Sequence, residues 1–88
     1  MIESKIQTAV ITRLKKAGWV VDKSIQHSHN GWPDITAYKF PGRVLFIEVK
    51  RPGQTPTALQ KYWHSRLRTM GFDCHVIDNV KQLEKIDL

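Results

Sequence analysis

The chain has 88 residues, of which 41% are hydrophobic and 25% charged, a composition typical of one small globular domain with a thin core. Its 14 Lys and Arg outnumber its 8 Asp and Glu, and the net charge of +6 favours a polyanionic partner such as nucleic acid. The single cysteine, Cys74, excludes an internal disulfide; no apolar run approaches the ~18 residues of a membrane span, and the N-terminus lacks the apolar core of a secretion signal. We therefore expect one domain over residues 1–88, located in the cytoplasm and not in a membrane.

The first half of the chain predicts one helix and two strands. Apolar residues recur at helical spacing over residues 2–17, and Gly18 is a natural stop for that helix. A strand begins at residues 19–21, and the polar stretch 24–33 is typical of a loop. Residues 34–39 contain Thr36 and Tyr38, which favour a second strand.

The second half begins with the strongest strand, residues 43–51, which carries apolar residues on both faces as a central strand does. A helix over residues 56–70 follows, with Thr55 as its cap and Pro56 in its first turn. Residues 72–77 predict another strand, in which Cys74 is a buried small hydrophobe, and a short last helix follows. The expected buried stripe of the 56–70 helix consists of Leu59, Tyr62, Trp63, Leu67 and Met70.

This order of helix, three strands, helix, strand and short final helix predicts an α/β fold with helices flanking a small mixed β-sheet. The turn signal Pro41-Gly42 makes the middle hairpin antiparallel. The strand–helix–strand unit over residues 43–77 predicts two parallel strands joined by a right-handed crossover.

The hairpin places two carboxylates together. A turn centred near Pro41 pairs residues whose numbers sum to about 82, so Asp34 falls opposite Glu48, with side chains ~4.5–5.5 Å apart. Such a pair is tolerable when one carboxylate is protonated or a cation lies between them, and oxygen ligands suit Mg²⁺, Mn²⁺ or Ca²⁺. Lys50 projects from the same face as Glu48, either as a catalytic group or as a salt-bridge partner.

Phosphodiester cleavage needs residues of these types. A divalent metal held by Asp34, Glu48 and the backbone carbonyl of Val49 would neutralise charge at phosphorus and activate water. Lys50 would orient that water or stabilise the developing charge. The pattern therefore predicts a metal-dependent enzyme that hydrolyses phosphodiester bonds.

Four further polar residues have two interpretations each. Glu3 borders the buried face of the first helix and can reach the site as a further metal ligand, or it can simply interact with the helix dipole. We expect a site role for Gln60, although it could instead close a capping box with Thr57. His27 and His29 form an H-x-H pair, which is more often polar loop surface than a metal site.

The chain resembles the PD-(D/E)XK nuclease superfamily, and more narrowly the stand-alone viral or bacterial VRR-NUC (virus-type replication-repair nuclease) domain. The residues that carry this resemblance are Glu3, Gly31-Trp32-Pro33-Asp34, Glu48-Val49-Lys50 and Gln60. The resemblance covers nearly the whole chain and implies a restriction-endonuclease-like core of helix, three-strand meander, helix and strand. It implies Mg²⁺ or Mn²⁺ bound by Asp34 and Glu48, Lys50 as the catalytic lysine, and supporting roles for Glu3 and Gln60.

The resemblance also implies a homodimer that acts on branched DNA such as four-way junctions, in a bacterial cell or a phage-infected host. The alternative function is a non-catalytic DNA-binding module on a nuclease-like fold. DNA contacts are expected from basic residues on helix faces away from the apolar stripes and beside the strands: Lys5, Lys39, Arg51, Lys61, His64, Arg66 and Arg68.

Overall fold

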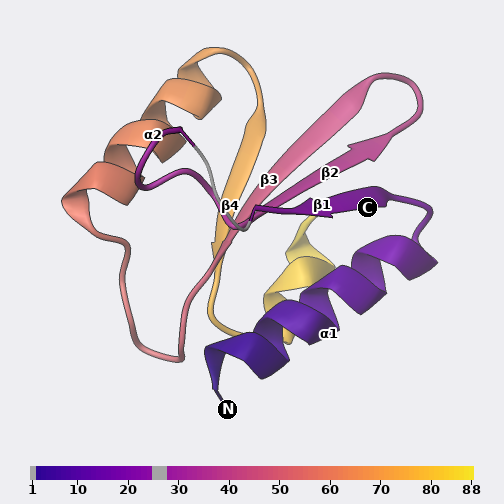
Figure 1. Ribbon diagram of the computed structural model, residues 1–88. Helices are drawn as coiled ribbons and strands as arrows, with labels where there is room; N and C mark the ends of the chain where they lie inside the picture. Colours follow the sequence, from indigo (N-terminus) through magenta and orange to yellow (C-terminus); the bar gives the residue numbers. More distant parts are fainter. Residues whose placement is uncertain (1, 25–27) are drawn as a thin grey trace.

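The computed structural model describes residues 2–24 and 28–88, which form two α-helices, four strands and a 3₁₀ helix (Figure 1). In chain order these elements are α1 (Glu3–Lys16), β1 (Val20–Lys23), β2 (Ile35–Lys39), β3 (Arg43–Val49), α2 (Ala58–Thr69), β4 (Asp73–Ile77) and η1 (Val80–Lys85). The α/β class and the order of elements predicted from the sequence are confirmed. Neither α-helix in the described part of the chain is long and apolar enough to cross a membrane.

The sheet is mixed, with the strand order β1-β2-β3-β4. β1 and β3 both run antiparallel to β2, whereas β3 and β4 are parallel and are connected through α2. In the β2–β3 hairpin Ile35 lies opposite Ile47 and Thr36 opposite Phe46, so the pairing predicted from the turn is confirmed. Asp34 and Glu48 are the next residues along these two strands beyond the Ile35–Ile47 pair.

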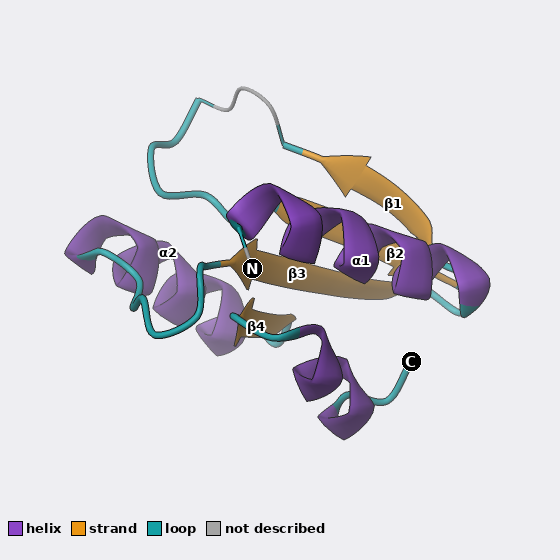
Figure 2. Cartoon of the chain, turned by 90° about the horizontal axis from the view of Figure 1, so that it is seen from below, coloured by secondary structure: helices purple, strands orange, loops and turns teal. Residues whose placement is uncertain are grey.

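The helices cover opposite faces of the sheet (Figures 1 and 2). α1 and η1 pack on one face, where Ile6, Val10 and Leu14 of α1 are completely buried. Burial of each such side chain contributes about 1.5–3 kcal/mol relative to its exposed state, so α1 is held mainly by this stripe. The core on this face continues through Trp19, directly before β1, and the sheet and η1 residues Ile35, Ala37, Leu45, Ile47, Val49, Ile77 and Leu83.

α2 packs on the other face with a different orientation from the one expected. It begins at Ala58 with Thr57 as its N-cap, so the predicted start at Thr55 and Pro56 is wrong. The predicted buried stripe is also wrong at three positions, because Leu59, Tyr62 and Met70 are 47%, 50% and 57% exposed. The helix instead buries His64 and Leu67, with Gln60 and Trp63 half-buried on the same side. This side faces a polar site, which is why its residues are not uniformly apolar.

Candidate active site

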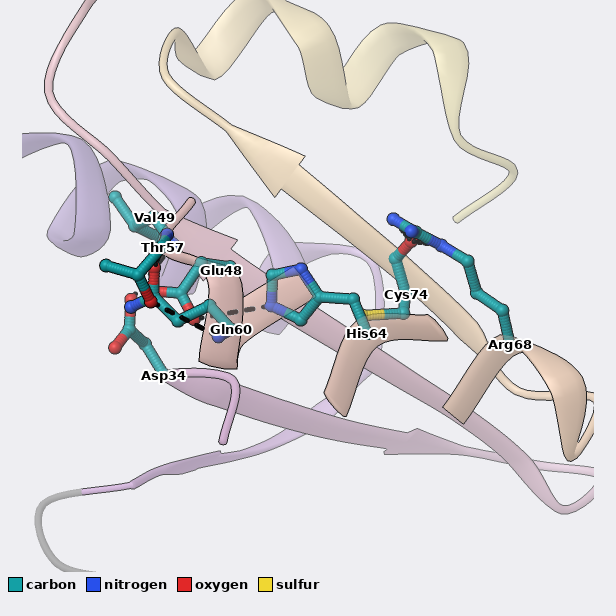
Figure 3. Close-up of polar contacts among 8 residues, drawn as sticks. All are labelled: Asp34, Glu48, Val49, Thr57, Gln60, His64, Arg68 and Cys74. Carbon is teal, nitrogen blue, oxygen red and sulfur yellow. Dashed lines mark hydrogen bonds and ion pairs between the residues drawn. The ribbon is translucent and has the colours of Figure 1, made fainter. Parts of the chain in front are cut away.

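The loop before β2 positions Asp34. Gly31 adopts a φ of +87°, and a Cβ atom there would lie 3.0 Å from the backbone carbon of Leu59, so only glycine allows this close approach to the start of α2. Pro33 is buried directly before Asp34. The Asp34 Oδ2 atom accepts a hydrogen bond of 3.0 Å from the backbone N–H of Val49 (Figure 3). Asp34 is therefore tied to β3 next to Glu48.

Glu48 lies in the middle of the sheet and its side chain is only 2% exposed. Burial is the main cause that raises its pKa to about 9, and the hydrogen bond with Asp34 and the charge of Asp34 raise it further. Its Oε1 atom is buried and makes no hydrogen bond to any described residue. Without a cation, the two carboxylates therefore hold a proton at neutral pH, as expected for like charges at this spacing.

Two further charged residues act on Glu48, one directly after its own strand and one on α1. Lys50 is half-buried two residues further along the chain, and its positive charge lowers the pKa of Glu48. Glu3 is half-buried in the first turn of α1, and its negative charge raises the pKa of Glu48. The structure thus brings Glu3, Asp34 and Lys50 close enough to Glu48 to influence its charge.

Gln60 belongs to the N-terminal cap of α2. Its Oε1 atom accepts from the Thr57 backbone N–H at 2.9 Å, and its own backbone N–H donates to Thr57 Oγ1 at 3.2 Å, which completes a capping box. The capping interpretation of Gln60 is therefore the one that its contacts show. Gln60 lies one helical turn before His64, which contacts Glu48, so capping fixes Gln60 on the face of α2 that carries His64.

His64 was predicted to contact DNA from the surface of α2, and this prediction is wrong. The residue is 1% exposed and its Nε2 atom lies 3.5 Å from Glu48 Oε1 (Figure 3). Burial, together with the charges of Arg68 and Lys50, lowers the pKa of His64, so its imidazole is neutral at physiological pH. The spacing Gln60…His64 places both on one helix face. That spacing is the signal in the sequence that could have identified His64 as a site residue.

The other basic residues predicted to contact DNA occupy varied positions. Arg68 donates two hydrogen bonds to the Cys74 carbonyl, at 3.0 and 2.7 Å, and so braces β4. Lys39 donates to the Leu88 carbonyl at the end of β2 opposite to Asp34, so it is not brought to the site. Arg66 lies over the rings of Tyr62 and Trp63. Exposed positions are occupied by Lys5, Arg51, Lys61 and Arg66.

An aromatic cluster anchors the loop that leads to Asp34. The ring of Trp32 lies 5.6 Å from that of Trp63 on α2 and meets the ring of Phe46 on β3 edge-on at 5.7 Å. His29 packs on Trp63 with 4.4 Å between ring centroids, whereas His27 lies outside the described residues. The packing of Trp32 on Trp63 and Phe46 therefore holds the Gly31–Asp34 motif against α2 and β3.

The oxygen donors fit a hard divalent cation. Asp34 and Glu48 offer two adjacent carboxylates, and the buried Oε1 of Glu48 makes no hydrogen bond to the rest of the described chain. Among residues 2–24 and 28–88, no three His, Cys, Asp or Glu side chains gather closely enough to hold a metal ion. Glu3 therefore does not complete a three-carboxylate group. A cation at the two carboxylates would take its other ligands from water or the main chain, as Mg²⁺ commonly does.

The mixed sheet, the carboxylates at the end of β2 and within β3, and the lysine two residues beyond define the restriction-endonuclease-like fold of PD-(D/E)XK nucleases. The VRR-NUC domain model matches residues 2–81, and the chain belongs to this family of nucleases. A solved VRR_NUC domain structure superposes with a TM-score of 0.86 at 28% identity, over 96% of this chain and 91% of that one. "Putative nuclease p44" of Acyrthosiphon pisum secondary endosymbiont phage 1 is 30% identical over 77 residues, 88% of this chain and 83% of its own.

Proposed function

We propose that this VRR-NUC protein is a divalent-metal-dependent endonuclease that hydrolyses phosphodiester bonds in DNA. The observation that carries the proposal is the arrangement of Asp34, Glu48 and Lys50, in which a buried carboxylate contacts a second carboxylate beside a lysine. A non-catalytic protein would gain stability by replacing the buried carboxylate of Glu48 with an apolar residue, so the costly arrangement favours catalysis. The net charge of +6 supports a polyanionic substrate.

The chain's own residues have separate tasks in this reaction. Asp34 and Glu48 would hold Mg²⁺ or Mn²⁺, with the Val49 carbonyl as a further candidate ligand, and Gln60 and Glu3 would support them. The cation would supply Lewis acidity toward the phosphate and lower the pKa of water. The Val49 N–H fixes one oxygen of Asp34. The ammonium group of Lys50, on the same strand face as Glu48, would stabilise the negative charge that develops on the phosphate oxygens.

We propose that the substrate is branched DNA, such as a four-way junction, and that the protein acts as a homodimer in the cytoplasm of a bacterium or phage-infected host. Two sites related by a two-fold axis would match the pseudo-two-fold symmetry of a four-way junction. The size of the chain supports this, because one 88-residue domain covers little DNA. The phage relative supports the setting.

Incubation of the protein with linear, flapped and four-way DNA in Mg²⁺, Mn²⁺ or EDTA tests the proposal. We expect metal-dependent cutting that is fastest on the four-way junction and is lost in Asp34→Asn and Glu48→Gln. The matched controls are Asp73→Asn and Glu84→Gln, which change exposed carboxylates elsewhere and should cut normally. DNA binding without cutting in any metal would leave only a non-catalytic binding module. Light scattering tests the dimer, and a mass near 10 kDa would exclude it.

A further inference from the structure

A pocket of about 380 Å³ lies on the sheet face that α2 covers only in part. Among the described residues, α2 packs mainly on β4 and does not cover the neighbouring surface of β1 and β2 on this face. The walls of the pocket are aromatic, formed by Trp32, Tyr38, Phe46 and Phe72, and its polar lining includes Asp22 and Thr36. Tyr38 and Phe72 are 43% and 39% exposed, so two of the aromatic side chains are accessible from solvent.

The pocket lies next to the carboxylate site along the strands, although Asp34 and Glu48 do not line it. Thr36 is two residues from Asp34 along β2, and Phe46 is two residues from Glu48 along β3. Residues two apart on a strand project from the same face about 6.5–7 Å from each other. If a phosphate is held at Asp34 and Glu48, the neighbouring nucleotide can therefore reach the pocket.

We propose that this pocket binds an unpaired nucleobase of the DNA, next to the phosphate that is cut. The inference rests on the proposed nuclease function and adds to it the feature of the substrate that the enzyme recognises. Aromatic side chains stack on any base, and each such stack contributes about 1–3 kcal/mol. The Asp22 carboxylate can accept hydrogen bonds from amino groups on a base edge, and the Thr36 hydroxyl can donate or accept.

The pocket gives a physical basis for a preference for branched DNA. A base within an intact duplex must be unpaired and unstacked before it can enter, at a cost of a few kcal/mol. At a junction, flap or bulge an unpaired base is already available, so that cost is small. The preference would then come from a single bound base as well as from the overall shape of the DNA.

The test compares two DNA duplexes that each carry one extra nucleotide, either a normal nucleotide or an abasic one. Binding is measured by fluorescence anisotropy in EDTA, so that no cutting is needed. We expect the wild type to bind the base-containing bulge roughly tenfold more tightly, in line with the contribution of one stacked base. Tyr38→Ala and Phe72→Ala should each reduce this ratio toward one without changing affinity for the abasic duplex.

Tyr62→Ala is the matched control, because Tyr62 is a similarly exposed aromatic residue that does not line the pocket. Tyr62→Ala should leave the ratio of the two affinities unchanged. Thermal melting of each variant checks that it is folded. Equal wild-type affinity for the two duplexes would overturn the proposal. So would a Tyr38→Ala variant that keeps the full ratio but changes from dimer to monomer, because the pocket would then be a subunit contact. A wild type that prefers the base but cuts no DNA would refute the nuclease function and still support the pocket.

Discussion

The Nε2 atom of His64 lies 3.5 Å from the Oε1 atom of Glu48, and neither atom makes a hydrogen bond to any other described residue. Both side chains are 2% exposed, so no bulk water replaces the missing partners. α2 therefore contacts the Glu48 carboxylate, in the middle of the sheet, through His64 Nε2. Since His64 contacts Glu48 and not the solvent, we interpret it as a positioning residue that sets the orientation of this carboxylate.

Replacement of His64 should change metal binding more than it changes folding. His64→Leu removes the contact with Glu48, and we expect affinity for Mn²⁺ in calorimetric titration to fall about 10- to 100-fold, the usual effect of losing a group that orients a metal ligand. His64→Gln can place an amide nitrogen near the position of Nε2 and should retain most of the affinity. Equal affinities for the Leu and Gln variants, both folded, would mean that His64 only fills space.

Replacement of Lys50 should slow DNA cleavage without changing the affinity for DNA or Mn²⁺. Lys50→Ala removes the positive charge beside Glu48, and we expect cleavage to slow by about 100-fold or more, as for the loss of a group that stabilises transition-state charge. DNA and Mn²⁺ affinities should stay close to wild type, because Lys50 does not hold the cation. Lys61→Ala, which removes an exposed lysine from α2, is the control. Near-normal turnover by the Lys50 variant would remove this lysine from the mechanism.

The stability of the metal-free protein should depend on pH through Glu48. Its pKa rises from 4.5 to about 9 on folding, so the folded state holds a proton between these pH values that the unfolded state releases. The free energy of unfolding therefore falls as pH rises through this range, with a slope of up to about 1.4 kcal/mol per pH unit for one proton. Denaturant melts in EDTA measure this slope. Glu48→Gln should flatten it, whereas a wild-type slope in that variant would assign the proton to another group.

Gly31 offers a test of how the loop positions Asp34. Gly31→Ala introduces a left-handed backbone strain of about 1–2 kcal/mol and a Cβ atom 3.0 Å from the Leu59 backbone. Gly53→Ala carries a similar strain, at φ +82°, but its Cβ atom would have open space. We expect the Gly31 variant to lose about 1–3 kcal/mol more stability than the Gly53 variant, and to bind Mn²⁺ less tightly. Equal losses in chemical denaturation would show that the loop is not packed closely on α2.

The sequence was most informative where one physical rule dominated. The length of the turn at Pro41 and Gly42 fixed the hairpin pairing, and with it the approach of Asp34 to Glu48. The apolar spacing of Ile6, Val10 and Leu14 likewise identified the buried face of α1. Both features depend on local geometry, which a sequence pattern records directly.

The sequence was least informative where polar residues are buried for function. The sheet-facing side of α2 carries Gln60 and His64, so an apolar pattern points to the neighbouring side with Leu59 and Tyr62, which is exposed. Propensity also favoured a start at Thr55, whereas the capping box at Thr57 fixes the actual one. The exposed aromatic residue Tyr38 belongs to a pocket that only the assembled sheet shows.

The residues around Glu48 come from separate parts of the chain: Glu3 from α1, Asp34 from the loop before β2, Lys50 from the end of β3, and His64 from α2. No fragment that lacks one of these elements can contain the whole group. A metal titration therefore also counts the folded molecules in a sample, because Asp34 and Glu48 meet only when β2 and β3 have paired. Heating should abolish Mn²⁺ binding and the α-helical circular dichroism signal together, in a single transition.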